Sequence, residues 1–142
     1  MKNKKVFIAI FSAISLAIVL LVVFLDNSSQ DVVKSEEKSM DKSLLVGDWI
    51  RTDASYLIKI NSVSEDGSLD AEYFNPKPIN VESANLEESY GNLKVTIVLR
   101  DVNYPGSRYT LTYLPDRDIL AGDYYQAVQG LNFYVEFVRN KD

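Results

Sequence analysis

The sequence predicts an all-β domain, an eight-stranded antiparallel up-and-down barrel, preceded by one N-terminal transmembrane or signal helix and a flexible linker. From Leu44 onward apolar and polar residues alternate, and the strand-like runs are separated by Gly, Pro, Asn and Asp at spacings of about ten residues. No stretch of about ten residues there has the spacing of an amphipathic helix. Short strands with one apolar face can close into a barrel, which removes both exposed edges. A two-sheet sandwich is the alternative.

Residues 1–25 are predicted to anchor the chain in a membrane. Val6–Leu25 contains nothing more polar than serine, and as a helix it spans about 30 Å, the thickness of the hydrocarbon core. Three lysines precede it within the first five residues, and an acidic domain follows. The positive-inside rule therefore places the N-terminus in the cytoplasm and the domain outside, with residues 6–25 in the membrane. The alternative is a cleaved signal peptide, which would leave a secreted or periplasmic protein.

Residues 26–43 are predicted to be a flexible linker and residues 44–142 the β-barrel domain. Asp26–Ser43 is rich in serine and charge and almost free of apolar residues, so it cannot bury enough surface to offset the entropy cost of ordering. A flexible coil of this length has a root-mean-square span of about 25 Å. We expect it to tether the barrel close to a membrane surface.

The composition excludes several kinds of site. The chain has no cysteine and no histidine, so it lacks thiolate and imidazole metal ligands and the usual general base. Residues 44–142 carry 15 acidic against 9 basic side chains, which disfavours nucleic-acid binding. Carboxylates such as Asp48, Asp70, Glu72 and Asp123 mostly alternate with apolar residues and are expected to face solvent. We expect no enzyme activity, no catalytic residue, no metal and no cofactor.

The alternation sets the strands and their inward faces. The strands are expected at 46–51, 55–62, 68–74, 79–85, 93–100, 107–114, 119–126 and 131–139. Glycine supplies the positive φ for hairpins at residues 65–67 and 90–92, and proline opens the turn at 115–118. The residues expected to point inward include Leu93, Val95, Ile97, Leu99, Tyr109, Leu111, Tyr113, Phe133, Val135 and Phe137.

The first and last strands of the barrel are expected to pair with each other. In an up-and-down meander of eight strands the start of the first strand lies beside the end of the last, so Trp49 and Arg139 should be in contact. A shielded guanidinium above an indole is worth about 1–2 kcal/mol. Gly47-Asp48-Trp49, together with Arg139, resembles the G-x-W and terminal arginine signature of the lipocalin and avidin (calycin) superfamily. This resemblance implies a small barrel with an open, ligand-binding mouth at its other end. Three segments also resemble uncharacterised exported bacterial proteins, which implies no activity: Tyr73–Val81, Leu99–Ser107 and Tyr124–Ala127.

The expected mouth gathers the loops at 52–54, 75–78, 101–106 and 127–130. The inward residues near it form the predicted ligand site: Arg51, Tyr56, Tyr73, Asn75, Asp101, Tyr109, Tyr124 and Gln126. Arg51 and Asp101 are expected to pair, while the inward residues toward the floor are mostly aliphatic or aromatic. A dry base beneath a ring of phenols and amides suits a small ligand with a polar head.

Two functions fit these patterns. The first is a membrane-tethered, extracytoplasmic, non-catalytic barrel that binds a small ligand at its open end, which requires an empty volume behind the tyrosines. The second is a cell-envelope module with a filled barrel that binds another protein. It requires an exposed apolar patch, to which Tyr125, Tyr134 and Val138 on the outer strands are the best contributors.

Overall fold

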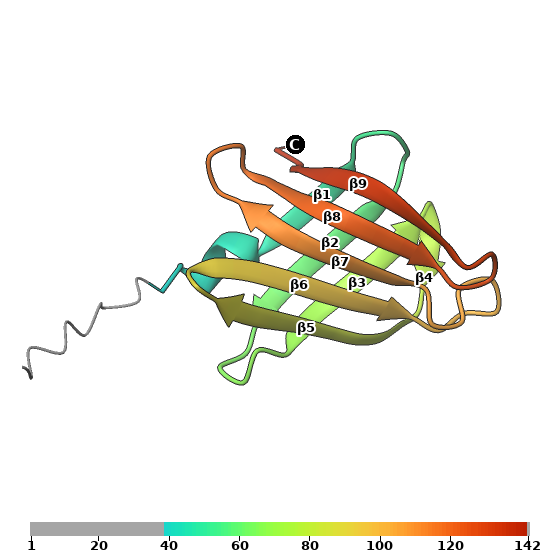
Figure 1. Cartoon of the computed structure of the whole chain (residues 1–142), viewed down its shortest axis with the longest axis horizontal. Coiled ribbons are helices and arrows are strands. Elements are labelled where there is room, and N and C mark those ends of the chain that lie inside the picture. Colours follow the sequence, from blue (N-terminus) through green and yellow to red (C-terminus); the bar gives the residue numbers. More distant parts are fainter. Residues whose placement is uncertain (1–38, 142) are drawn as a thin grey trace, which may run out of the picture. The chain divides into compact units, whose positions relative to one another are not determined.

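The computed structural model of the chain describes residues 39–141, which form a nearly closed antiparallel β-barrel (Figure 1). The predicted anchor at residues 6–25 lies outside the described residues. Within residues 39–141, no helix has the length and apolar character needed to cross a membrane.

Nine strands follow one short 3₁₀-helix. They are η1 (Lys42–Leu45), β1 (Gly47–Arg51), β2 (Leu57–Val63), β3 (Leu69–Asn75), β4 (Lys77–Ile79), β5 (Val81–Ser89), β6 (Asn92–Leu99), β7 (Arg108–Leu114), β8 (Ile119–Gln126) and β9 (Leu131–Arg139). Their order in the sheet is β4-β3-β2-β1-β9-β8-β7-β6-β5, and every pair is antiparallel. The all-β antiparallel class is confirmed.

The prediction of eight strands is wrong at one place, because the strand expected at 79–85 is two strands. β4 pairs with β3, and β5 pairs with β6. The switch occurs at Asn80, whose backbone N–H and side-chain amide both donate to the Asp101 carboxylate on the β6–β7 loop, at 3.0 and 2.8 Å. Pro78 also has no N–H to extend the ladder with β3.

The barrel keeps one seam, between β3 and β5, so the expectation that closure removes both edges is also wrong. An isolated bridge joins Ser68 to Asn85. Beside it the Leu86 N–H donates to the Gly67 carbonyl at 2.7 Å. These two contacts hold the seam at its lower end, where the β2–β3 turn lies.

The predicted inward face is confirmed over most of the sheet. On β6, the side chains of Leu93, Val95, Ile97 and Leu99 are fully buried, and the residues between them are partly exposed. Tyr109, Leu111 and Tyr113 on β7 are buried in the same way. On β9, Val135 and Phe137 are buried whereas Phe133 is exposed. On β8 the consecutive residues Ile119, Leu120 and Ala121 are all buried, but only Leu120 belongs to the core cluster that the inward faces of the other strands form.

The predicted contact between Trp49 and Arg139 is confirmed. The two residues are direct partners in the β1–β9 ladder, and the guanidinium carbon of Arg139 lies 4.2 Å from the centre of the indole. The same guanidinium binds the Asp118 carboxylate, with Nε to Oδ2 at 2.8 Å, and donates to the Val46 carbonyl at 2.9 Å. Arg139 therefore joins the first and last strands of the barrel to the β7–β8 turn.

Gly47 leaves the space that the Arg139 guanidinium occupies. Its φ is +138°, which side-chain-bearing residues rarely adopt, and a Cβ there would lie 2.9 Å from Nη1 of Arg139. The glycine of the G-x-W pattern thus leaves room for the guanidinium.

The 3₁₀-helix η1 covers the floor of the barrel. Leu45 is fully buried, and its carbonyl accepts a hydrogen bond from Trp49 Nε1 at 2.9 Å. Met40, within the range 26–43 assigned above to the linker, packs against the core. The described chain therefore enters the barrel at its floor, and the mouth lies at the opposite end (Figure 1).

Replacing Arg139 by alanine should lower the free energy of unfolding by about 2–3 kcal/mol, because the cation–π contact and the charged hydrogen bonds are lost together. Urea titration followed by circular dichroism measures this. Arg117→Ala is the matched control, since Arg117 makes one exposed ion pair with Glu136, and its effect should stay within about 0.5 kcal/mol. Equal losses in the two variants would contradict the role given to Arg139.

The Asp118–Arg139 pair should make stability fall in acid. Hydrogen bonds from Arg139 lower the pKa of Asp118 below its usual value near 3.8. A lowered folded-state pKa stabilises the fold above the unfolded pKa, and this contribution is lost as the pH falls through the lowered value. The stability difference between the parent and Asp118→Asn, measured by urea titration from pH 6 down to pH 2, should therefore be constant above about pH 5 and shrink below pH 4. A difference independent of pH would count against the ion pair.

Candidate functional site

The mouth contains a hollow of about 380 Å³. Six of the eight predicted site residues line it: Arg51, Tyr56, Tyr73, Asn75, Tyr124 and Gln126. Five of them come from the ends of β1, β3 and β8, and Tyr56 directly precedes β2. The hollow also has four lining residues that were not in the predicted set: Asp53, Ala54, Tyr104 and Phe133.

Buried phenol rings close the hollow from below. The hydroxyls of Tyr73 and Tyr109 share a hydrogen bond at 2.9 Å. The Tyr109 ring is fully buried, stacks on Tyr124 with ring centres 4.5 Å apart, and meets Phe137 edge-on. Tyr109 is therefore part of the base of the hollow rather than its lining. The empty volume expected behind the tyrosines is filled by side chains, so the space for a ligand is the hollow above them, not the interior of the barrel.

Burial further disfavours ionisation of these phenols. It raises the pKa of Tyr109 to about 12, and it raises the pKa of Tyr73 further above the ordinary value of 10.0. The shared hydroxyl bond therefore persists through the physiological pH range without a buried charge.

The predicted pairing of Arg51 with Asp101 is wrong. Arg51 binds Asp53 through two hydrogen bonds, from Nε to Oδ1 and from Nη2 to Oδ2 at 3.0 Å. Asp53 follows Arg51 by two residues in the turn after β1, so the local partner is always within reach, whereas Asp101 is held by Asn80 outside the hollow. Arg51 lowers the pKa of Asp53, and its guanidinium also lies 5.2 Å from the centre of the Tyr56 ring.

The opposite wall combines an amide with an aromatic loop residue. The Asn75 side chain donates a hydrogen bond to the Tyr104 hydroxyl. Tyr104 belongs to the β6–β7 loop and packs against the core. Within residues 39–141, the Gln126 amide and the Tyr56 hydroxyl have no hydrogen-bond partner, and both line the hollow. These groups are free to bind a ligand.

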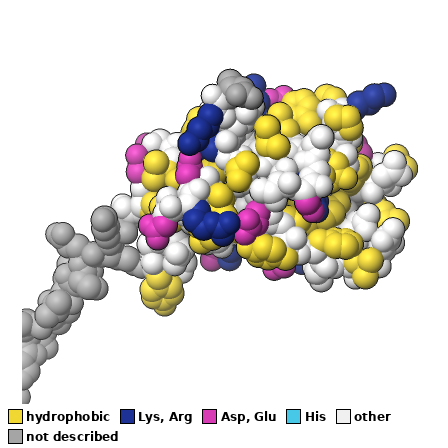
Figure 2. Space-filling view, turned by 90° about the horizontal axis from the view of Figure 1, so that it is seen from above, with side chains coloured by type: hydrophobic (Ala, Val, Ile, Leu, Met, Phe, Trp, Pro, Cys, Tyr) yellow, Lys and Arg dark blue, Asp and Glu magenta, His cyan; other side chains and the backbone are white. Residues whose placement is uncertain are grey.

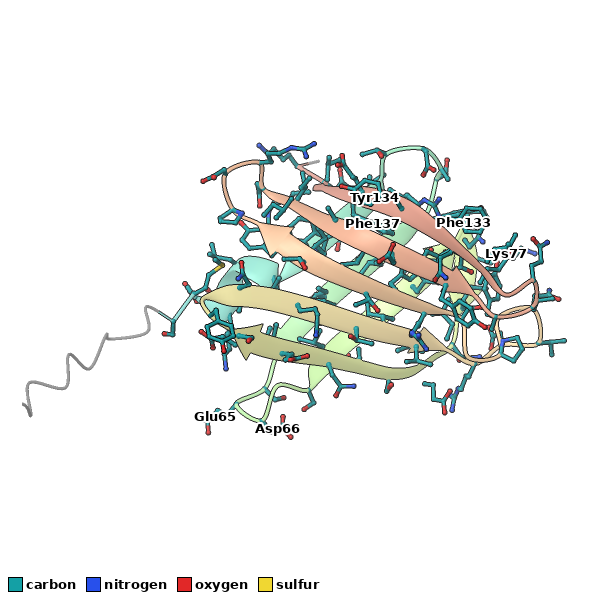
Figure 3. All side chains as sticks on the ribbon, viewed as in Figure 1. Glu65, Asp66, Lys77, Phe133, Tyr134 and Phe137 are labelled. Carbon is teal, nitrogen blue, oxygen red and sulfur yellow. The ribbon has the colours of Figure 1, made fainter. Side chains whose placement is uncertain are left out.

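Phe133 adds the most exposed aromatic ring of the site. It is 42% exposed, and its ring lies nearly parallel to that of Tyr124, with an interplanar angle of 26°. Figure 3 shows Phe133 at the same end of the barrel as Lys77, and Glu65 and Asp66 at the other end. Its inward position on β9 was a usable signal in the sequence, whereas a loop residue such as Tyr104 has no alternation to place it.

Two other hollows, of about 440 and 450 Å³, lie near the floor. They are lined mainly by Ser, Asn, Glu and Lys side chains and have no cluster of aromatic rings. Within residues 39–141, no group of three or more acidic side chains could hold a metal ion. The mouth is therefore the candidate site, because aromatic and polar groups from several strands converge there.

Comparison of the chain with protein-family models, with curated proteins and with solved structures gave no match.

Replacing Tyr109 by phenylalanine should lower the free energy of unfolding by about 1–3 kcal/mol, because the Tyr73 hydroxyl loses its partner in the core. The double variant Tyr73→Phe, Tyr109→Phe removes both hydroxyls and should recover part of that loss. Urea titrations of the parent, the two single variants and the double variant measure the coupling. Additive losses would contradict the buried hydroxyl bond.

Proposed function

We propose that this protein is a non-catalytic barrel, tethered outside the cytoplasm by residues 1–25, that binds a small ligand at its mouth. The observation that carries the proposal is the hollow of about 380 Å³, in which unpaired polar groups and aromatic rings from several strands face one volume. Its size falls in the range of about 300–1,000 Å³ typical of small-ligand sites. The proposed site residues are the six predicted residues that line the hollow, together with Asp53, Tyr104 and Phe133.

Two further features support this function. The arrangement of Gly47, Trp49 and Arg139 resembles the floor of lipocalin- and avidin-like barrels, whose ligands enter at the opposite end. The described chain also enters at the floor beside η1. The described residues that lead into β1 therefore leave the mouth uncovered.

Binding of another envelope protein is the second candidate, and the exposed end of β9 favours it. β1 pairs with β9 only from Trp49–Arg139 to Arg51–Phe137, followed by one hydrogen bond from Thr52 to Glu136. Within the described chain, the first residues of β9 therefore have no strand on that side. Tyr134 is 66% exposed and Val138 is also exposed, whereas Tyr125 is partly covered by Arg108. In the view from above, Figure 2 shows hydrophobic side chains interspersed with charged groups on the surface.

Native mass spectrometry of the full chain, purified from the membranes of its host, tests the first function against the second. A small molecule should accompany the parent and be lost from the double variant Gln126→Ala, Phe133→Ala, which removes two groups that line the hollow without opening the core. Tyr134→Ala is the control, because this side chain points outward from the same strand.

A small molecule retained equally by all three proteins would contradict a ligand site at the mouth. A ligand-free parent that carries a protein, which Tyr134→Ala loses, would instead support the second candidate.

A further inference from the structure

The two charged side chains that line the hollow neutralise each other. Among residues 39–141, Arg51 and Asp53 are the only charged residues that line the hollow, and they bind each other through two hydrogen bonds. A ligand phosphate or carboxylate would meet a guanidinium whose charge is already balanced by the Asp53 carboxylate. The pair is neutral overall, which favours an uncharged ligand over an ion at this site.

The depth of the mouth is limited by its base. Tyr73 and Tyr109 are 1% and 0% exposed and share a hydrogen bond, so their rings occupy the space that an acyl chain would enter in an empty barrel. Opening that space would leave two buried hydroxyls without a hydrogen-bond partner. A ligand must therefore be bound near the rim rather than threaded into the core.

The surface that remains suits a ring with one apolar face and a polar edge. The exposed face of Phe133 attracts C–H groups, because aromatic faces carry partial negative charge. The same hollow is lined by the Gln126 amide and the Tyr56 hydroxyl, which both donate and accept hydrogen bonds, and by the Asp53 carboxylate, which only accepts. Hydroxyl groups on a ligand can satisfy all three.

We propose that the mouth binds an uncharged pyranose sugar, with a C–H face of the sugar on Phe133 and its hydroxyls bonded to Gln126, Tyr56 and Asp53. This inference rests on the proposed function and specifies its ligand class. Free sugars and the terminal units of envelope glycans share this chemistry.

The test is saturation-transfer difference NMR on the full chain in a polyoxyethylene detergent, which has neither a sugar headgroup nor a charge. The probes are neutral hexoses, N-acetylhexosamines, short neutral oligosaccharides and, in a separate sample followed by ³¹P NMR, inorganic phosphate. Ring protons of at least one sugar should receive saturation, and phosphate should not bind. Phe133→Ala should weaken sugar binding about tenfold, the loss expected for one aromatic contact, whereas Tyr134→Ala should leave it unchanged. Preference for the oligosaccharides over single sugars would identify a glycan as the source.

Sugar binding that is equal in the parent and in Phe133→Ala would overturn the proposal, and so would the absence of any sugar signal. These failures are distinct from failure of the proposed function. A co-purifying acyl or anionic molecule that depends on Gln126 and Phe133 would leave the mouth as a ligand site and reject the sugar class alone.

Discussion

The barrel depends on one guanidinium. Arg139 stacks on the indole of Trp49 and at the same time binds Asp118 and the carbonyl of Val46. Trp49 lies in the first strand and Val46 directly precedes it, whereas Asp118 lies in the β7–β8 turn, so one side chain at the end of β9 connects two parts of the fold that are distant in the sequence. Lysine could not replace it, because a single ammonium has neither the planar face for stacking nor the spread of five donors. Gly47 completes the arrangement by leaving the space that the guanidinium fills.

The mouth takes its shape from the aromatic rings beneath it. Phe137 contacts Tyr109, Tyr109 stacks on Tyr124, and Tyr124 lies alongside Phe133 at the rim. Each ring is positioned by the one below, so the orientation of the exposed Phe133 ring is set by packing in the core. A site built on such a column is preorganised, which reduces the entropy cost of ordering it when a ligand binds.

Alternation alone predicted much of this structure. Period-two patterns gave the positions of most strands, the inward faces of β6 and β7, the meeting of Trp49 with Arg139, and six of the residues that line the mouth. Alternation could not show that Asn80 would bind Asp101 and split one strand into two, because that contact joins side chains from two loops. It also could not choose between Asp53 and Asp101 as the partner of Arg51, since that choice depends on the path of the turn after β1. Loop residues such as Tyr104 have no period from which to place them.

Because of the seam between β3 and β5, the barrel is not closed by a continuous hydrogen-bonded ladder. A fully closed barrel can widen only by breaking ladder hydrogen bonds or by changing the tilt of its strands. Within residues 39–141, the backbone pairing across this seam consists of the bridge at Ser68–Asn85 and the bond from Leu86 to Gly67, and breaking it leaves the ladders of β1 with β9 and of β5 with β6 intact. The diameter of the barrel thus depends on the contact between β3 and β5, whereas the pairing of its first and last strands depends on β1 and β9. The barrel can widen at the seam while the contact between Trp49 and Arg139 at the floor is kept.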